Sequence, residues 1–234
     1  MVFGGSGVIG GAIATAFGQQ GWTVGIHYHQ HQSAAIETAT TIQKAGGKSS
    51  LYQADVAISS QVCDTLQNFM QSHSFLNVLV WAVGLGSSTL LVKTSPQEWT
   101  HTLQTNLTGA YHVLKAVAPI FERQKDGAVI LVGSLSGEQG VAGQAAYAAS
   151  KAGLLGLMRT AAREWGAFNI RVNGIFPGWH LSRLSEPGWH SVMEHRLHTL
   201  HRTPSLKDVA NSVYHLALSP GTSGQVWNLD SRIW

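Results

Sequence analysis

Short apolar runs alternate with longer amphipathic segments along the chain. The apolar runs have the length of β-strands, and they lie at residues 22–28, 49–54, 76–82, 128–133, 170–176 and 225–229. The amphipathic segments repeat apolar residues at helical spacing, and they lie at residues 8–20, 33–45, 59–72, 96–123, 144–166 and 205–218. The pattern therefore predicts strands and helices in strict alternation.

Several of the predicted strands are apolar without a break, for example residues 78–80 and 129–132. A strand that is buried on both faces has this pattern, and such strands form parallel sheets covered by helices. Because crossover connections are right-handed, the sheet must be doubly wound. A chain of 234 residues is long enough for one such domain and too short for two. We predict a single α/β domain of Rossmann type over residues 1–234.

Only Met1, Val2 and Phe3 precede the first glycine-rich turn. Either the first strand is very short or the protein begins upstream of Met1, and the sequence leaves both possibilities open. Residues 1–17 are apolar but have no basic segment before them, so we do not interpret them as a signal peptide.

Charged residues make up 12% of the chain, and the formal net charge is +3. This charge is small and not concentrated, which argues against a nucleic-acid-binding protein. So few charges favour a homo-oligomer that buries part of its surface. The only cysteine is Cys63, which fits a reducing, cytoplasmic compartment. No apolar run reaches the roughly 18–20 residues of a membrane span.

The segment 4–10 (GGSGVIG) lies between the short first strand and the first predicted helix. Glycine permits a tight turn and a close approach of the backbone to a pyrophosphate, and the following helix offers free N–H groups. A glycine cluster can also be an ordinary strand–helix turn. Its position at the first junction of an alternating chain favours a dinucleotide site.

The end of the second predicted strand reads HYHQH over residues 27–31, and the next carboxylate is Glu37. A site for NAD usually has an acidic residue there to bind the ribose 2′-hydroxyl. Its absence favours NADP(H) over NAD(H), and a partly protonated His27 or His29 would attract the 2′-phosphate. Alternatively, His27, His29 and His31 could share one face of an extended strand and hold a metal, as could His195, His198 and His201 at helical spacing. No matching carboxylates or thiols accompany either group, so we predict no metal site.

Tyr147 and Lys151 lie one turn apart on one face of a predicted helix. An ammonium group lowers the pKa of a neighbouring tyrosine, which can then exchange a proton near neutral pH. A surface helix pair is the alternative. Ser134 follows the apolar run 128–133, and ligands of open α/β sheets bind beyond the carboxyl ends of strands. The intervening residues 135–144 are mostly small, as expected of a loop at a binding site.

Taken together, these motifs resemble the short-chain dehydrogenase/reductase family over essentially the whole chain. Residues 4–10 look like its cofactor turn, residues 54–56 like its adenine-contacting strand end, and residues 106–109 (NLTG) like its mid-helix asparagine motif. Ser134, Tyr147 and Lys151 match its catalytic spacing, and residues 171–178 match the segment after its sixth strand. Residues 143–147 (GQAAY) are most similar to bacterial 3-oxoacyl-[acyl-carrier-protein] reductases.

The resemblance implies a role for each catalytic residue. Tyr147 would be the general acid in reduction and the base in oxidation. Lys151 would lower the pKa of Tyr147 and hold the nicotinamide ribose. Ser134 would bind the substrate carbonyl oxygen, and Asn106 would anchor a water that links Lys151 to solvent. The cofactor-binding residues would be Gly4, Ser6, Gly7, Ile9, Gly10, His27, His29, Asp55, Val56, Ala82, Gly84, Tyr147, Lys151, Pro177, Gly178, His180 and Ser182.

Two positions depart from the family pattern. Val8 stands where the family usually has glycine, and residues 81–84 (WAVG) stand where it has Asn-Asn-Ala-Gly. We interpret the second departure as a change in packing rather than a loss of chemistry. Only the glycine of that motif, Gly84, is present here, and we expect it to remain a cofactor-binding residue.

The resemblance implies an oxidoreductase that reduces a 3-oxoacyl thioester or a similar ketone with NADP(H), as in fatty acid biosynthesis. A dehydrogenase of small alcohols, polyols or steroids, and a catalytically silent dinucleotide-binding scaffold, are the alternatives. Residues 179–202 would form the substrate lid, whose Trp and Met residues would line an apolar pocket or contact a partner subunit. The apolar end, Ile233 and Trp234, would be buried against a partner in a homotetramer. The sequence does not give the exact substrate or the direction of the reaction.

Overall fold

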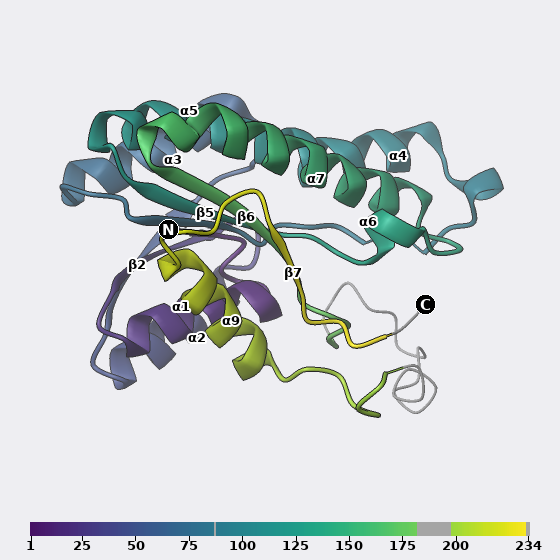
Figure 1. The fold of residues 1–234 in the computed structure, drawn as a ribbon, viewed down its shortest axis with the longest axis horizontal. Helices are drawn as coiled ribbons and strands as arrows, with labels where there is room; N and C mark the ends of the chain where they lie inside the picture. Colours follow the sequence, from purple (N-terminus) through teal and green to yellow (C-terminus); the bar gives the residue numbers. More distant parts are fainter. Residues whose placement is uncertain (87, 182–197, 233–234) are drawn as a thin grey trace.

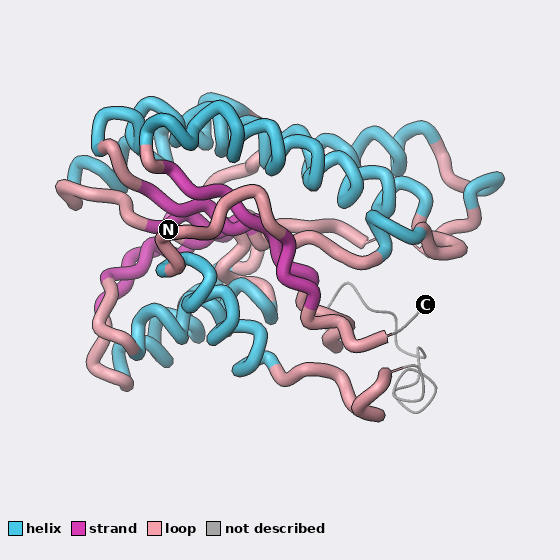
Figure 2. The backbone as a smooth tube through the Cα atoms, in the orientation of Figure 1, coloured by secondary structure: helices cyan, strands magenta, loops and turns pink. Residues whose placement is uncertain are grey.

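The computed structural model describes residues 1–86, 88–181 and 198–232. Its seven strands form one parallel sheet in the order β3-β2-β1-β4-β5-β6-β7 (Figure 2). The strands are β1 (Val2–Phe3), β2 (Thr23–Tyr28), β3 (Lys48–Gln53), β4 (Val78–Trp81), β5 (Gly127–Val132), β6 (Ile170–Phe176) and β7 (Val226–Asn228). The strand order reverses direction at β1, so the prediction of a doubly wound Rossmann-type sheet is confirmed.

Helices cover both faces of the sheet (Figure 1). One layer holds α1 (Val8–Gln19), α2 (Gln32–Lys44) and α9 (Leu206–Leu218). The other holds α3 (Ser59–Ser72), α4 (Pro96–Leu103), α5 (Gly109–Gln124) and α7 (Ala145–Trp165). None of the helices that the structure describes is long and apolar enough to cross a bilayer.

The two layers enclose two separate apolar clusters, one on each face of the sheet. In β4, Leu79 and Trp81 belong to one cluster, whereas Val78 and Val80 belong to the other. Successive side chains of a strand point to opposite faces, so a strand between two helical layers must be apolar at every position. This explains the unbroken apolar runs in the sequence.

The predicted helix 96–123 is wrong in one respect, because it is interrupted. A π-helical turn, η2 (Gln104–Thr108), separates α4 from α5. Three short helices were also not predicted, namely η1 (Leu91–Lys93), α6 (Ser136–Gln139) and η3 (Gly166–Phe168). A π-helical turn inside a helix often marks a functional site, and this one carries Asn106.

The carboxyl ends of β1 and β4 lie side by side, since Phe3 pairs with Trp81. The chain leaves β1 toward β2 and leaves β4 toward β5, in opposite directions along the sheet. Ligands of doubly wound sheets bind in the crevice at this reversal point. The glycine-rich turn and the end of β5 both border it.

Candidate active site

Ser134 and Tyr147 come together at the carboxyl end of β5. Ser134 follows the strand after one glycine, and the first turn of α7 carries Tyr147. The Ser134 hydroxyl is close enough to the Tyr147 phenol to oppose the rise in its pKa that burial causes. The Ser134 Oγ also accepts a hydrogen bond from the Ser136 N–H at 3.2 Å, which fixes its position. The two hydroxyls thus lie together as the spacing of the sequence predicts.

Lys151 lies beside this pair and is almost completely buried. Its Nζ donates a hydrogen bond to the Val132 carbonyl oxygen at 2.9 Å and lies 5.6 Å from the centroid of the Tyr147 ring. Burial lowers the pKa of Lys151 to about 8, because the charged form is poorly solvated there.

The pKa of Tyr147 differs from the sequence-based expectation. Lys151 was expected to lower it, but burial has the largest effect in this structure and raises the pKa of the Tyr147 phenol. The Ser134 hydroxyl opposes that rise. The Lys151 amine is directed at the Val132 carbonyl oxygen, so in this structure Ser134 is the group that favours the phenolate.

Asn106 connects the π-helical turn to two neighbouring segments. Its side chain is fully buried in η2, and its Oδ1 accepts a hydrogen bond from the Leu85 N–H at 2.6 Å. Its Nδ2 donates to the Leu85 carbonyl oxygen at 2.9 Å and to the Ser150 Oγ at 3.0 Å. Both amide protons are therefore used within the protein. The side chain of Asn106 therefore positions Leu85 and Ser150, and the expectation that Asn106 anchors a water for Lys151 stays a prediction.

Gly84 provides space next to the Lys151 amine. A Cβ atom at this position would lie 3.5 Å from the Lys151 Nζ and 4.0 Å from the Asn106 Oδ1. A longer side chain would therefore fill the region beside the amine. Asn106, through its bonds to Leu85, holds this segment in place.

The glycine-rich turn has room for backbone atoms only. Gly4 has a φ of +81°, and a Cβ there would lie 2.7 Å from the Ala82 carbonyl oxygen. A Cβ at Gly10 would lie 2.2 Å from the Gly4 carbonyl oxygen. Both positions therefore require glycine.

The turn leads to a helix end that fits an anionic group. Gly7 is the N-cap of α1 and, like Val8, is exposed, and the first turn of α1 carries no acidic residue. The first N–H groups of a helix have no partner within it, so this end attracts a pyrophosphate. Val8 is the first helical residue and needs no special backbone conformation, which explains why it can replace the glycine of the family pattern.

The residues predicted for the adenosine half lie after β2 and β3. Asp55 follows β3, and its Oδ2 lies 3.9 Å from the Nε2 of His29, which is half exposed. Val56 is buried beneath them.

His27 contradicts the sequence-based expectation. It is only 2% exposed, and burial lowers its pKa to about 4. It is therefore neutral near pH 7 and does not offer a positive charge to a 2′-phosphate. Its two ring nitrogens contact Gly4 and Ala54.

Pro177 and Gly178 follow β6 directly, with Gly178 at a φ of +78°. The Nε2 of His180 lies 3.0 Å from the Pro177 carbonyl oxygen, and burial lowers the pKa of His180. Ser182 and residues 182–197 of the predicted lid lie outside the described residues, as do Ile233 and Trp234.

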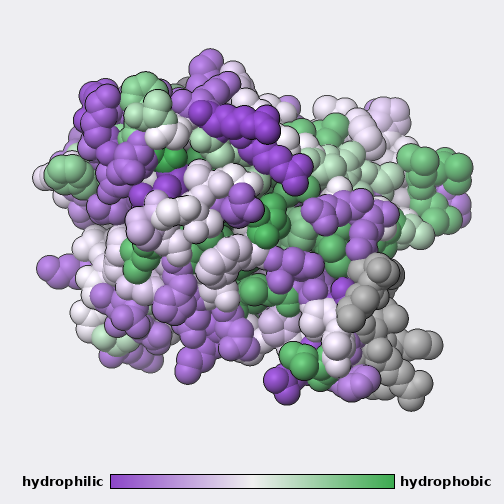
Figure 3. Space-filling model, viewed as in Figure 1, coloured by the Kyte–Doolittle hydropathy of each residue, from purple (hydrophilic) through white to green (hydrophobic). Residues whose placement is uncertain are grey.

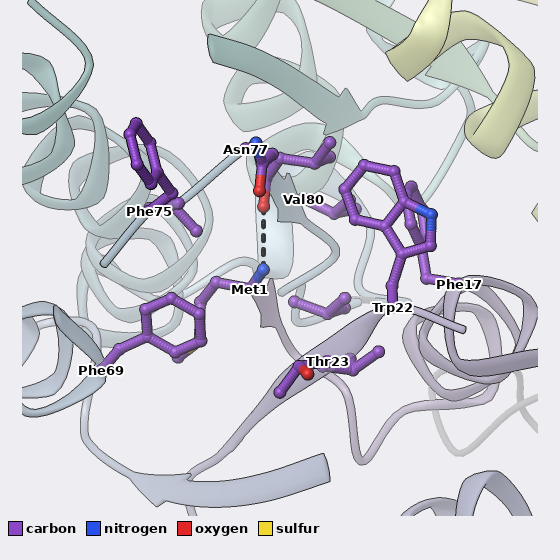
Figure 4. A pocket seen from close by; sticks show the side chains of 12 residues that line it. Met1, Phe17, Trp22, Thr23, Phe69, Phe75, Asn77 and Val80 are labelled. Atoms are coloured by element: carbon purple, nitrogen blue, oxygen red, sulfur yellow. Dashed lines mark hydrogen bonds between the residues drawn. The ribbon is translucent and has the colours of Figure 1, made fainter. Parts of the chain in front are cut away.

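One pocket lies away from these groups, at the amino ends of β2 and β4 (Figure 4). Its lining is mostly apolar and includes Phe17, Trp22 and Phe69. The Met1 amine donates a hydrogen bond to the Val78 carbonyl oxygen at 2.8 Å across this region. The pocket is separate from the candidate active site, because Ser134 and the glycine-rich turn follow carboxyl ends of strands.

The sequence analysis did not single out Ser150, which connects Asn106 to the backbone of Tyr147. Its hydroxyl is fully buried, donates to the Tyr147 carbonyl oxygen at 2.7 Å and accepts from Asn106. Ser150 lies three residues after Tyr147, so helical spacing alone places it near the same face. That spacing is the feature of the sequence that could have revealed it.

The sequence profile of the short chain dehydrogenases matches residues 1–190. The chain belongs to this family. As a short-chain dehydrogenase it is an NAD(P)-dependent oxidoreductase, and the sequence-based prediction of the family is confirmed.

Relatives of this short-chain dehydrogenase support the assignment along most of its length. The 3-oxoacyl-[acyl-carrier-protein] reductase FabG of Staphylococcus epidermidis is 33% identical over 219 residues, which cover 93% of this chain and 90% of that protein. The 3-oxoacyl-[acyl-carrier-protein] reductase of Synechocystis is 31% identical and covers 98% of this chain and 94% of that protein. A putative short-chain alcohol dehydrogenase from Sinorhizobium meliloti has a similar structure, with a TM-score of 0.93 and 25% identity, covering 98% of this chain and 93% of that one.

Proposed function

We propose that this short-chain dehydrogenase reduces the ketone of a 3-oxoacyl thioester, or a similar ketone, with NADPH. The observation that carries the proposal is that the Ser134 and Tyr147 side chains come together at the end of β5, beside the buried Lys151 amine. Two hydroxyls at one point can bind a single carbonyl oxygen. The 3-oxoacyl reductases of Staphylococcus epidermidis and Synechocystis support the substrate class.

In this reaction Ser134 and Tyr147 act on the carbonyl oxygen. The Ser134 hydroxyl donates a hydrogen bond that orients the ketone. The Tyr147 hydroxyl gives its proton to the oxygen as the carbonyl carbon is reduced, and it takes the proton back in the oxidation direction. The bound nicotinamide supplies or accepts the hydride. With the cofactor bound, Lys151 would hold the nicotinamide ribose hydroxyls, and its ammonium would pass a proton toward Tyr147 and regain one from solvent.

The dinucleotide would lie along the carboxyl edge of the sheet. The turn of Gly4, Ser6, Gly7, Ile9 and Gly10 would hold the pyrophosphate, supported by its close packing and the free helix end. Asp55 and Val56 would contact the adenine. Ala82, Gly84, Pro177, Gly178, His180 and Ser182 would lie along the nicotinamide half.

The preference for NADP(H) over NAD(H) follows from the end of β2. Tyr28, His29 and Gln30 bring no carboxylate to this end, so a 2′-phosphate meets no repulsion from β2 itself. Asp55 is nearby, and its Oδ2 lies 3.9 Å from the Nε2 of His29.

Fluorescence titration with NADPH and NADH tests the cofactor, and a panel of acetoacetyl thioesters and simple ketones tests the substrate. We expect tighter binding of NADPH and the highest kcat/KM with the thioester. Strong NADH preference would contradict the interpretation of β2. Turnover of simple alcohols alone would favour an alcohol dehydrogenase, to which the Sinorhizobium meliloti structure gives support. Cofactor binding without any turnover would favour a scaffold.

We further propose a cytoplasmic homo-oligomer, with a tetramer as the expected form. Leu90, Leu91 and Val92 are 53%, 69% and 90% exposed on and beside η1. Apolar side chains gather at the end of the molecule that carries η1 (Figure 3). Exposed apolar surface of this kind favours contact with another subunit. Light scattering coupled to size exclusion measures the oligomeric state, and a monomer at micromolar concentration would contradict the proposal.

A further inference from the structure

His27 connects the carboxyl ends of three neighbouring strands, β1, β2 and β3. Its backbone carbonyl oxygen accepts a hydrogen bond from the Gly5 N–H at 2.9 Å. Its Nδ1 accepts a hydrogen bond from the Gly4 N–H at 3.1 Å, and its Nε2 lies 3.0 Å from the Ala54 carbonyl oxygen. Gly4 follows β1, His27 lies in β2, and Ala54 follows β3. The imidazole therefore links the segment after β1 to the segment after β3.

The two partners determine the tautomer of this imidazole. The Gly4 N–H can only donate, so Nδ1 must be unprotonated. The Ala54 carbonyl oxygen can only accept, so Nε2 must carry the proton. A doubly protonated ring would direct an Nδ1–H at the Gly4 N–H, and burial also disfavours the charge. His27 is thus a neutral link with one acceptor and one donor.

The groups that His27 holds are those proposed to contact the cofactor. Gly4 has a positive φ, and its carbonyl oxygen accepts from the Gly7 N–H at 2.9 Å, so its position determines the shape of the turn. Ala54 directly precedes Asp55. The Phe3 ring packs on the imidazole with 4.8 Å between ring centroids, which leaves it little freedom to move.

We propose that His27 is a positioning residue for the dinucleotide, in that its neutral imidazole fixes the glycine-rich turn relative to the end of β3. The inference rests on the proposed cofactor site and adds a residue that sets its affinity. His27 is buried and contacts the site through Gly4 and Ala54. It affects cofactor affinity and leaves proton transfer at Tyr147 unchanged.

Three substitutions of His27 test its side-chain contacts with Gly4 and Ala54 separately. His27→Asn keeps an acceptor near the Nδ1 position, and His27→Gln keeps a donor near the Nε2 position. His27→Leu removes both. His31→Leu is the matched control, because His31 is an exposed histidine of the same segment and its side chain makes no capping bond to α2.

We expect His27→Leu to raise the Kd for NADPH by about 10-fold or more, from the loss of two hydrogen bonds. His27→Asn should recover most of that affinity, because it keeps the bond to the turn, and His27→Gln should recover less. At saturating NADPH the kcat of each variant should remain within about 3-fold of wild type. A thermal melt of each variant shows whether it is folded at the temperature of the titration.

The imidazole itself can be observed in the protein without nucleotide. ¹⁵N NMR of the wild type should show a protonated Nε2 and an unprotonated Nδ1 for His27 at neutral pH. The opposite tautomer, or equal NADPH affinity of wild type and His27→Leu, would overturn the inference while leaving the proposed function intact. A wild-type protein that binds neither NADPH nor NADH would overturn both.

Discussion

The Lys151 Nζ donates a hydrogen bond to the carbonyl oxygen of Val132, at 2.9 Å, and so connects the middle of α7 to the last residue of β5. Ser134 lies two residues beyond Val132, and Tyr147 lies one helical turn before Lys151. The same bond therefore holds the two hydroxyl-bearing segments next to each other. The fold keeps this contact although the Lys151 amine is poorly solvated there.

Replacing Lys151 by Met should abolish activity and make the protein more stable at pH 7. Burial lowers the pKa of Lys151 from 10.5 to about 8, so the folded state binds this proton less tightly than the unfolded state. Below pH 8 the buried ammonium therefore destabilises the folded state by about 3 kcal/mol. The substitution removes that destabilisation but leaves the Val132 carbonyl oxygen without a donor, which costs about 1–3 kcal/mol. We expect the free energy of unfolding to rise by about 1 kcal/mol in urea titrations.

The pH dependence gives a sharper test of the Lys151 burial. Between pH 8 and 10.5 the unfolded chain holds more protons than the folded protein, so wild-type stability should increase with pH across this window. The Lys151→Met protein has no such group and should show a flatter curve. A wild type whose stability falls between pH 8 and 9.5 relative to Lys151→Met would contradict the assigned pKa direction.

Tyr147→Phe removes the proposed proton donor and little else. We expect kcat/KM for ketone reduction to fall by about 10²–10⁴-fold, the usual contribution of a general acid. The far-ultraviolet circular dichroism should be unchanged, because the ring is kept. Residual activity within 10-fold of wild type would mean that another group protonates the ketone oxygen.

Ser134→Ala should shift the pH profile of the reverse reaction. The Ser134 hydroxyl lowers the pKa of Tyr147, so its loss raises that pKa further. Alcohol oxidation needs the phenolate as base, and its kcat/KM should therefore rise with pH at a higher apparent pKa than in wild type. Ser134→Thr keeps the hydroxyl and is the control. Identical profiles for the alanine variant and wild type would show that Ser134 does not tune Tyr147.

Gly10→Ala should disrupt cofactor binding through the backbone. The new Cβ would lie 2.2 Å from the Gly4 carbonyl oxygen, and neither atom can move without changing the turn. We expect at least about a 10-fold increase in the Kd for NADPH, measured by fluorescence. Gly156→Ala, where no atom lies within 4 Å of the new Cβ, should leave the Kd unchanged. Equal Kd values for both variants would show that the turn tolerates the shift.

Much of the fold follows from the apolar periodicity, because the central strands β4 and β5 are buried on both faces and are apolar throughout. The catalytic spacing of Tyr147 and Lys151 likewise follows from helical geometry. Features that depend on neighbouring segments were not predictable. The pattern over residues 96–123 is helical throughout, but Asn106 bonds to Leu85, from the loop after β4, and a π-helical turn surrounds it.

His27 shows the same limit for a side chain. Alternation along an extended segment placed His27 and His29 on one face, which would be correct if the strand continued. The strand β2 ends at Tyr28, so His29 lies beyond it and is exposed, whereas His27 lies between the ends of β1 and β3. The difference comes from where the neighbouring strands end, and these are distant in the sequence.

Asn106→Ala should separate positioning from chemistry. The substitution leaves the part-buried Leu85 N–H and carbonyl groups without their partner and removes the donor to the buried Ser150 hydroxyl, which keeps its bond to the Tyr147 carbonyl oxygen. Each unsatisfied buried group costs about 1–3 kcal/mol, so we expect the free energy of unfolding to fall by about 3 kcal/mol. Because Leu85 adjoins Gly84, which borders the Lys151 amine, kcat should fall even below the melting temperature. Asn106→Asp keeps the acceptor for the Leu85 N–H but directs a second carboxylate oxygen at the Leu85 carbonyl oxygen in a buried position, so its stability should be no higher than that of Asn106→Ala. If Asn106→Ala unfolds at the wild-type urea concentration, the three hydrogen bonds do not hold the site together.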